Sequence, residues 1–581
     1  MNSNKLIVRR NVSAEKSDFD VALSPLLQRV YAARGVFDGK QLDYSLSKLH
    51  PISALKGINA AVKLLAEALA EQQHIMVVAD FDADGATSCT VAIRALRSMG
   101  AEQVSYLVPN RFEYGYGLTP EIVELAKQQQ PDLIVTVDNG ISSIDGVIAA
   151  KEAGIRVLVT DHHLPGAQLP EADAIVNPNQ PGDEFPSKNL AGVGVIFYVM
   201  LALRAHLRDA GWFEKQGVTV PNLTTLLDIV ALGTVADVVP LDHNNRILVS
   251  QGLARIRSRA CCAGISALLN IGKRQANNIV ASDLGFAVGP RLNAAGRLED
   301  MSLGIECLLA DDPDAALLLA QRLDELNRER REIEGEMQAQ ALDCLENIKL
   351  DIEDENAPIG LCLFDKSWHQ GVVGIVASRI KDRYHRPVIA FALANTDVVT
   401  SDDAEIKGSA RSIKGVHMRD VLDAVAATHP GLLTKFGGHA MAAGMTLKAA
   451  DLKAFDAAFN EVLRSSVDDE TLQDVIHSDG ELDNSELSLE QAEALRAAGP
   501  WGQAFPEPLF DGDFEVVQQR IVGEKHLKLV LRPVGSHNMI DAIAFNHSDM
   551  AGERLHAAYR LDVNEYMGRR TVQLMVEHIT V

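Results

Sequence analysis

Four short apolar runs, rich in β-branched residues, recur in the first third of the chain, at residues 75–79, 104–108, 133–137 and 156–160. Stretches with helical spacing lie between them, notably 88–98 and 120–128. Nearly continuous apolar runs indicate strands buried on both faces, and such strands form parallel sheets covered by helices. The pattern therefore predicts an α/β domain with a parallel sheet, in which ligands bind beyond the carboxyl ends of the strands.

The segments on either side of this domain have helical patterns. Residues 1–70 contain amphipathic stretches near 25–35 and 58–69, for which packing is the simplest role. Residues 192–194, Gly-Val-Gly, are expected to form a tight turn into a helix at 195–207. One long amphipathic helix is expected from residue 313 to about 348, and a helix of this kind most simply bridges two domains.

The second half of the chain predicts two further domains. A strand at 359–364 opens a smaller α/β domain, and an acidic stretch at 466–500 has the pattern of a linker with one helix near its end. Five short alternating runs between residues 514 and 579 suit a small β-barrel of the OB type, a common platform for single strands. The expected boundaries are 1–70, 71–312, 313–350, 356–465, 466–500 and 501–581.

Composition places the chain among globular proteins of several domains, because 581 residues exceed what one hydrophobic core holds. The six cysteines form no CxxC pair, which argues against a zinc site or a disulfide framework and favours a reducing cytoplasm. No apolar run reaches the length of a membrane span, and the N-terminus lacks the apolar core of a signal peptide. We therefore expect a cytoplasmic protein without a membrane partner.

The net charge of −24 taken alone argues against a nucleic-acid partner. The basic residues are concentrated locally, however, at 255–259, 322–331, 379–386 and 525–532. Because the distribution of charge matters more than its sum, the sign leaves the partner open. Residues 327–331 on the long helix fit two interpretations equally, a surface facing DNA or a solvated face of i,i+4 ion pairs.

Carboxylates gather where the first apolar run ends. Asp80, Asp82 and Asp84 occupy alternate positions and are followed at once by Gly85. Three carboxylates on one face of a buried strand would be desolvated at high cost, so we expect the strand to end there and the acids to surround a cation. An acidic loop that caps the next helix is the alternative.

Further polar residues follow the later strands. Asp138 comes after the third apolar run, Asp161, His162 and His163 come after the fourth, and Asp237 follows an apolar stretch expected to be helical. The carboxyl ends of parallel strands meet at one edge of a sheet, so these side chains should converge. Oxygen and imidazole ligands without thiolates suit Mn²⁺ or Mg²⁺, and the supply is sufficient for two ions.

Asp161-His162-His163, together with Asp82-Ala-Asp84 and Asp138-Asn-Gly, resembles the DHH phosphoesterase superfamily. Within it, the segments 289–298, 368–379, 408–412 and 436–444 are similar to signatures of the bacterial exonucleases that degrade single-stranded DNA from the 5′ end. The similarity runs from about residue 25 to the C-terminus. It implies a DHH catalytic domain, a DHHA1 accessory domain and a C-terminal barrel that binds single strands.

The resemblance also implies roles for individual residues. His163 would contact the scissile phosphate, and Asp161 would orient a histidine from behind the ligands. Asp80 is the least certain ligand, because the superfamily pattern is anchored on Asp82 and Asp84. The expected metal ligands are Asp80, Asp82, Asp84, Asp138, His162 and Asp237.

DNA contacts are expected from several loops. Ser409 and Arg411 are expected to follow a strand. With Arg291 or Arg297 they would hold the 5′ phosphate, near a helix entered after Gly371. Without the resemblance, Arg411 is equally well interpreted as an ordinary surface arginine. His439 would lie against the catalytic cleft. Arg111 and Tyr116 would touch the substrate unless they belong to an ordinary aromatic loop. Asn293 and Arg379 complete the expected substrate contacts.

In the barrel region, Lys525, His526, Lys528 and Arg532 would contact phosphates. Trp501 and Phe505 either stack on bases or pack at the domain junction, and packing is the better interpretation.

Three functions remain to be weighed. The first is an exonuclease that releases mononucleotides from the 5′ end of single-stranded DNA in recombination and repair. The second is a DHH phosphodiesterase acting on dinucleotides or short RNA, which usually lacks the barrel expected at 501–581. The third is an inactive replication scaffold, which would require lost ligands. For the exonuclease, the resemblance implies a single-strand-binding protein and a helicase as partners, and we expect a monomer.

Overall fold

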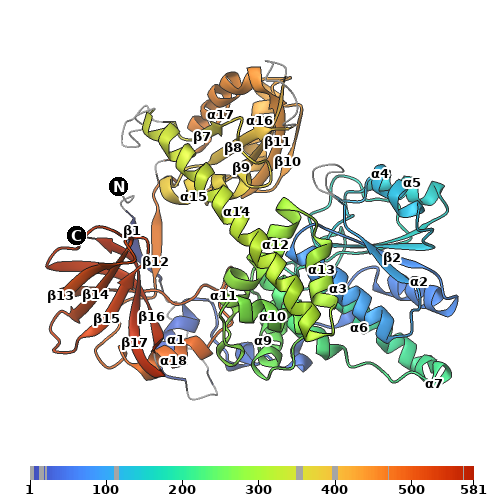
Figure 1. Ribbon diagram of the computed structural model, residues 1–581, viewed down its shortest axis with the longest axis horizontal. Coiled ribbons are helices and arrows are strands. Elements are labelled where there is room, and N and C mark those ends of the chain that lie inside the picture. Colours follow the sequence, from blue (N-terminus) through green and yellow to red (C-terminus); the bar gives the residue numbers. More distant parts are fainter. Residues whose placement is uncertain are drawn as a thin grey trace.

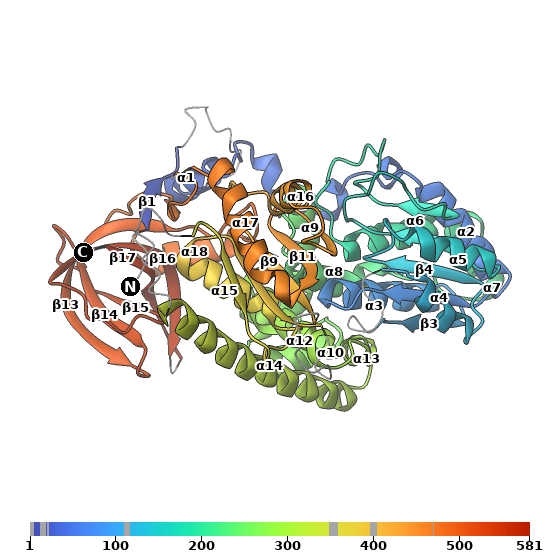
Figure 2. The same cartoon turned by 90° about the horizontal axis from the view of Figure 1, so that it is seen from above.

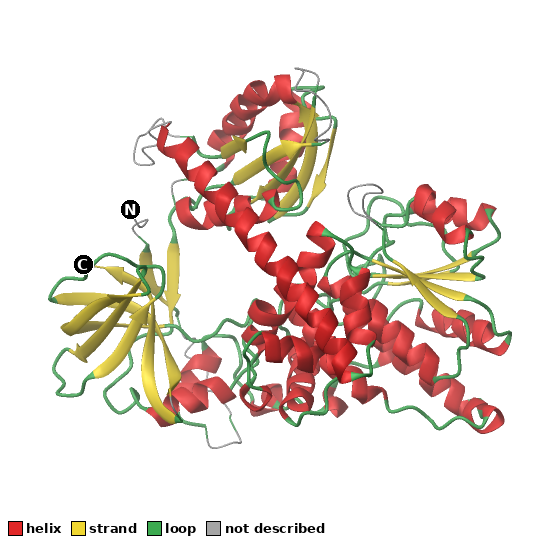
Figure 3. Ribbon diagram, viewed as in Figure 1, coloured by secondary structure: helices red, strands yellow, loops and turns green. Residues whose placement is uncertain are grey.

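The structure is a computed structural model that describes residues 5–11, 19, 23–109, 117–347, 358–394, 404–468, 470–566 and 568–580. A parallel-sheet domain and a β-barrel lie at opposite ends of the molecule, and a smaller α/β domain stands above the region between them (Figure 1). The view from above keeps the same order (Figure 2), and Figure 3 separates the helices from the strands. Among the described residues, no helix is both long and apolar enough to cross a membrane.

The first sheet confirms the prediction of a parallel, fully covered sheet. Its strands run in the order β3-β2-β4-β5-β6, all parallel, and the last of them was not predicted. Helices α2, α3 and α6 cover one face, and α4 and α5 cover the other. The strands are β2 Ile75–Ala79, β3 Val104–Leu107, β4 Leu133–Val137, β5 Arg156–Thr160 and β6 Ala174–Val176. The helices are α2 Ile58–Ala70, α3 Ala83–Ser98, α4 Pro120–Lys127, α5 Ile144–Glu152 and α6 Gly192–Asp209.

A group of helices follows the sheet and ends in the predicted long helix. These helices extend the same hydrophobic core, and α14 continues from it to the second α/β domain, as Figure 1 shows. Their bounds are α7 Trp212–Gln216, α8 Leu227–Ala236, α9 His243–Arg257, α10 Ala263–Ile271, α11 Ala281–Asp283, α12 Gly289–Leu298, α13 Ser302–Leu309 and α14 Pro313–Asn347.

The basic stretch 327–331 on α14 forms ion pairs within the protein. Arg328 pairs with Asp324 and Arg330 pairs with Glu334, each four residues along the helix. The i,i+4 ion pairs of the second interpretation are therefore present. The Arg330–Glu334 pair is buried, however, and does not belong to a solvated face.

The second α/β domain has a mixed sheet in the order β10-β11-β9-β8-β7. Only β7 and β8 are parallel. Helix α15 and the end of α14 pack on one face, and α16 and α17 pack on the other. The strands are β7 Leu361–Phe364, β8 Val388–Leu393, β9 Glu405–Arg411, β10 Lys435–Gly438 and β11 Ala442–Lys448, and the helices are α15 Val373–Tyr384, α16 Met418–Thr428 and α17 Leu452–Ser466.

Ser409 and Arg411 lie inside β9, which corrects the expectation that they follow a strand. The polar, glycine-containing sequence of β9 hides its strand character. Gly408 is needed there because a Cβ would lie 2.4 Å from the ring of Phe391 on the neighbouring strand.

The C-terminal strands close into the predicted five-stranded barrel, in the order β13-β14-β15-β17-β16. Leu26 and Val30 of α1 and Leu495 of α18 join its hydrophobic core. The strands are β13 Phe510–Val522, β14 His526–Pro533, β15 Ile540–Ala544, β16 Arg554–Tyr566 and β17 Arg569–Thr580, and the two helices are α1 Pro25–Ala32 and α18 Leu489–Ala497.

One connection was not predicted. β1 (Leu6–Arg9) pairs in parallel with β12 (Val475–Ser478), inside the stretch expected to be a linker with a single helix. Both strands are short and their partners are far apart along the chain, so a local pattern does not reveal them. Residues 6–9 are thereby attached to the C-terminal part of the chain.

Trp501 and Phe505 pack at the junction beneath the barrel, as the better interpretation had it. Their rings stack with centroids 5.1 Å apart, and Phe505 is buried. The guanidinium of Arg246 lies 4.2 Å from the Phe505 ring centroid, so this ring faces protein.

Candidate active site

The acidic loop after β2 changes from strand to helix within its five residues, 80–84. Asp82 is the N-cap of α3, and its Oδ1 accepts hydrogen bonds from the backbone N–H groups of Asp84 (2.8 Å) and Gly85 (3.0 Å). A Cβ on Gly85 would lie 2.4 Å from the carbonyl oxygen of Asp80, so glycine is required at this close approach. The strand ends as expected, and the helix begins earlier than the predicted residue 88. Both interpretations of the loop therefore hold: Asp82 caps helix α3, and the acids lie together where the strand ends.

Asp84 is held by the start of α6. Its carboxylate is fully buried and accepts hydrogen bonds from the backbone N–H groups of Gly192 (2.7 Å) and Val193 (3.0 Å). Gly192 is the first residue of α6 and not part of a preceding turn, which corrects the sequence-based expectation. A Cβ there would lie 2.7 Å from Oδ1 of Asp138. The glycine thus lets the positive end of the helix approach two carboxylates.

The later strand ends bring their polar side chains to the same place. Asp138 follows β4 with a left-handed φ of 61°, and His162 follows β5. The Nε2 atom of His162 lies 3.2 Å from Oδ1 of Asp138 and 3.5 Å from Oδ2 of Asp237, at the end of α8. Three groups have ligand atoms within 4.8 Å of one another: Asp80, Asp82 and Asp138; Asp84, His162 and Asp237; Asp138, His162 and His163. The structure thus brings all six expected ligands together.

The charges of this cluster favour a bound cation. Burial, and then the charges of neighbouring carboxylates, raise the pKa of Asp84 and of Asp138 well above the ordinary value. Burial and the charge of Asp82 raise the pKa of Asp237 to about 7. A divalent cation would offset this repulsion.

The donor atoms also suit a metal ion. Burial, and then the nearby His163, lower the pKa of His162 to about 4, so its ring is neutral and able to bind a metal. Its buried Nε2 and the buried Oδ2 of Asp237 make no hydrogen bond within the described ranges. Carboxylates and an imidazole without thiolates fit Mn²⁺ or Mg²⁺.

Asp161 organises the histidine pair from behind. It is buried and accepts hydrogen bonds from the backbone N–H groups of Ile141, His162 and His163 and from Nδ1 of His163 (2.8 Å). Burial alone would lower the pKa of His163, but the hydrogen bond and charge of Asp161 outweigh it and raise the pKa to about 9. At neutral pH His163 therefore carries a proton next to the cluster.

Two residues that the sequence did not single out also fix this pair. Asn177 donates to the carbonyl oxygen of His163 (2.9 Å), and Asn179 donates to that of His162 (2.6 Å). Both follow β6, the strand that was not predicted. Their position after a strand at the same edge is the signal that could have found them.

The second domain reaches the cluster through His439, between β10 and β11. Its ring stacks on that of His163, with centroids 6.4 Å apart and planes inclined by 24°. Gly438 has a φ of +148°, and a Cβ there would lie 2.4 Å from the carbonyl oxygen of Ala442, so this turn requires glycine. The acidic cluster therefore faces the second α/β domain, as predicted for His439.

Ser409 and Arg411 meet the first turn of α15. Arg411 donates from Nη1 to Oγ of Ser409 (3.0 Å). A Cβ on Gly374 would lie 2.8 Å from both Nη2 of Arg411 and Oγ of Ser409. Helix N-terminal amides, a guanidinium and a hydroxyl are thus close together, which is a suitable set for a phosphate.

The other expected substrate residues have protein partners. Arg291 is buried and pairs with Asp324 of α14 (2.8 Å), and Arg379 donates to Glu334 (2.8 Å). Asn293 accepts from the backbone N–H of Ala83 (2.8 Å). Arg297 donates to the carbonyl oxygen of Gly371 (3.1 Å), just before α15. Arg111 and Tyr116 lie outside the described residues.

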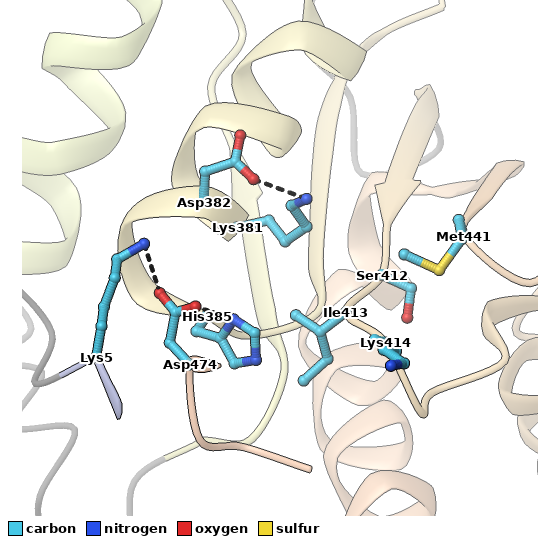
Figure 4. A pocket seen from close by; sticks show the side chains of 9 residues that line it. All are labelled: Lys5, Lys381, Asp382, His385, Ser412, Ile413, Lys414, Met441 and Asp474. Atoms are coloured by element: carbon cyan, nitrogen blue, oxygen red, sulfur yellow. Dashed lines mark ion pairs between the residues drawn. The ribbon is translucent and has the colours of Figure 1, made fainter. Parts of the chain in front are cut away.

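A separate cavity of about 250 Å³ lies between the segment that follows β9, the end of α15 and the segments preceding β1 and β12 (Figure 4). Lys5 and His385 both lie close to Asp474, at 2.8 and 3.5 Å, and Lys381 pairs with Asp382. None of the expected metal or DNA contacts that the structure describes lines this cavity.

Comparison with protein families divides the chain into three matching parts. Residues 74–234 match the DHH family, N-terminal domain, residues 357–465 match the DHHA1 domain, and residues 478–578 match the RecJ OB domain. Over 577 residues, the chain is 54% identical to the single-stranded-DNA-specific exonuclease RecJ of Dickeya dadantii and 52% identical to that of Escherichia coli, covering 98% of each protein.

The chain belongs to the RecJ family. The RecJ structure of Thermus thermophilus in complex with Mn²⁺ is similar, with a TM-score of 0.77 and 30% identity, and the match covers 96% of this chain and 76% of that one. The corresponding Mg²⁺ complex gives a TM-score of 0.72 and 28% identity, with 96% and 75% covered. The order of the domains in this chain is therefore that of the RecJ family.

Proposed function

We propose that this protein is a metal-dependent exonuclease that degrades single-stranded DNA from the 5′ end to mononucleotides, in DNA recombination and repair. The observation that carries the proposal is the convergence of five carboxylates and His162 at one sheet edge, facing His439 of the second domain. Membership of the RecJ family supports the same activity.

The cluster is proposed to hold two Mn²⁺ or Mg²⁺ ions through Asp80, Asp82, Asp84, Asp138, His162 and Asp237. Two groups of three potential ligands without a shared member support the number. Bound divalent ions supply a hydroxide nucleophile at neutral pH and neutralise charge on phosphoryl oxygens.

The chain's own residues are proposed to position and protonate the substrate. His163, kept protonated by Asp161, donates a hydrogen bond to the scissile phosphate or a proton to the departing 3′ oxygen. His439, whose ring stacks on that of His163, is proposed to limit the space for the DNA strand.

The 5′ phosphate is proposed to bind Ser409, Arg411 and the N-terminal amides of α15, with Arg297 beside them. Contacts from Arg111, Tyr116, Arg291 and Arg379 to the substrate stay predictions, as do the two protein partners and the monomeric state.

The alternatives have less support. A phosphodiesterase for dinucleotides or short RNA would share the metal cluster, but the closed barrel and the RecJ OB domain match favour longer DNA. An inactive scaffold is disfavoured because the ligand set is complete.

The test is a direction assay with Mn²⁺ and single-stranded DNA labelled at either end. We expect mononucleotides to be released from the 5′ end, and Asp138→Ala to lower the rate by more than about 100-fold because a ligand is lost. Degradation from the 3′ end, or equal rates on blunt duplex, would contradict the proposal.

A further inference from the structure

Helix α12 contacts the backbone of the acidic loop 80–84 on both sides of Asp82. Oδ1 of Asn293 accepts a hydrogen bond from the backbone N–H of Ala83 (2.8 Å). One helical turn later, a Cβ on Gly296 would lie 1.9 Å from the carbonyl oxygen of Phe81. Residues three apart share a helix face, so one face of α12 touches the loop immediately before and immediately after Asp82.

The Asn293 contact completes the cap of α3. The first amides of a helix have no partner within the helix. Asp82 accepts from those of Asp84 and Gly85, and Asn293 accepts from that of Ala83. Oδ1 of Asp82 accepts two of these hydrogen bonds. The orientation of the Asp82 carboxylate therefore depends on the backbone conformation of residues 83–85, which the three hydrogen bonds maintain.

The type of residue fits this location. An amide oxygen accepts the hydrogen bond without adding charge to a cluster in which carboxylates already raise one another's pKa. Neighbouring contacts keep α12 in place: Arg291 pairs with Asp324 of α14, and Arg297 donates to the carbonyl oxygen of Gly371. Helix α12 thus connects the acidic loop with the start of α15, whose first turn contacts Ser409 and Arg411 of β9.

We propose that Asn293 is a positioning residue that holds the metal-binding loop, and that it is not a DNA contact. This inference depends on the proposed metal-dependent activity. The two roles make opposite predictions: a positioning residue affects metal affinity without DNA, whereas a DNA contact affects DNA affinity without metal.

The experiment compares Asn293→Ala, Asn293→Asp and the wild-type protein. Mn²⁺ binding is measured by calorimetry without DNA, and binding of a single-stranded oligonucleotide is measured by anisotropy in EDTA. Asn293→Ala should weaken Mn²⁺ binding about 10-fold and lower kcat at limiting Mn²⁺, with partial rescue at high Mn²⁺. DNA affinity in EDTA should stay within about 2-fold of the wild type. Asn270→Ala, on the exposed end of α10, is the matched control.

Asn293→Asp keeps the acceptor atom and the side-chain shape, so it tests the proposal even if the alanine variant folds poorly. Its Mn²⁺ affinity should not fall, and its DNA affinity should be unchanged. If Asn293 touched DNA phosphates, the new negative charge would weaken DNA binding about 10-fold or more. That result, or unchanged Mn²⁺ affinity in a folded Asn293→Ala variant, would overturn the inference. Mn²⁺ binding remains informative even if the wild type fails to cleave DNA, so the two failures are distinguishable.

Discussion

Arg411 is the residue whose position most directly suggests recognition of a DNA end. Its guanidinium lies beside Ser409 and the first turn of α15. A charged hydrogen bond to a phosphate contributes about 1.5–3 kcal/mol, so Arg411→Ala should reduce any preference for 5′-phosphate over 5′-hydroxyl ends by about 10- to 100-fold. Paired rate measurements on the two substrates check this, with the exposed Arg464→Ala as control. An undiminished preference in the Arg411 variant would exclude the end-binding role.

Single residues were predictable where chemistry and strand position coincide. The six expected ligands could be proposed because five of them follow buried strands and Asp237 follows an apolar helix, and all six converge in the structure. The residue with which each arginine pairs was not predictable in this way. Arg291 and Arg379 have the same charge as Arg411, but only the fold shows that Asp324 and Glu334 lie beside them. The role of Gly192 likewise depends on a contact with Asp138, which is distant in sequence.

At the scale of elements, α14 and α15 are joined by buried charges. Glu334 accepts hydrogen bonds from Arg330 of the same helix (2.6 Å) and from Arg379 of α15 (2.8 Å), and both Arg330 and Glu334 are buried. Arg330 also donates to the fully buried Asn327 (2.7 Å). One carboxylate therefore links the two helices, in addition to their apolar packing.

Glu334→Ala should be strongly destabilising, because it leaves the Arg330 guanidinium buried without its charge partner. Removing one partner of a buried ion pair costs about 3–5 kcal/mol. Differential scanning calorimetry should show a lower transition temperature for this variant than for Glu336→Ala, which removes an exposed carboxylate two residues away. Equal transition temperatures would mean that the buried network contributes little to the attachment of α15.

Helices and strands were predictable where a pattern of neighbouring residues reveals them. The strands β2, β4 and β5 are mostly apolar and were predicted with correct bounds. β1 and β12 were missed because each has four residues and the strand with which it pairs is remote in the chain. Helix α3 was predicted too short because its first turn contains the acids and glycine of the metal-binding loop.

At the scale of the molecule, the N-terminal strand is fastened to the barrel by Asp511. This buried carboxylate pairs with Arg9 of β1 (2.7 Å) and also faces His556 at 3.5 Å. Burial alone would raise the pKa of Asp511, but the hydrogen bonds from Arg9 and Ser478 and the charge of Arg9 outweigh it, so the pKa is lowered from 3.8.

A lowered pKa in the folded state means that the Asp511 carboxylate stabilises the fold above pH 3.8 and loses this effect as the pH falls through the folded-state value. Asp511→Asn should therefore lower the transition temperature at neutral pH, and the difference from the wild type should shrink on acidification below that pH. Melting curves across the acid range measure it, with the exposed Asp549→Asn as control. A difference that grows on acidification would contradict the assignment.

The barrel and the parallel-sheet domain lie at opposite ends of the molecule (Figures 1 and 2), so we expect only a long strand to reach both. Of the four phosphate contacts predicted in the barrel, Arg532 pairs with Glu515, Lys528 lies 3.6 Å from Asp541, and the His526 ring packs edge-on against Phe545. Lys525 is exposed and forms no ion pair with any described residue.

Lys525→Ala should weaken binding of a long single strand and reduce the slope of log affinity against log salt by about 0.7, the value for one lost phosphate contact. Lys453→Ala on α17 is the control. Since a short oligonucleotide occupies only the catalytic end, equal losses for short and long strands would rule out this contact.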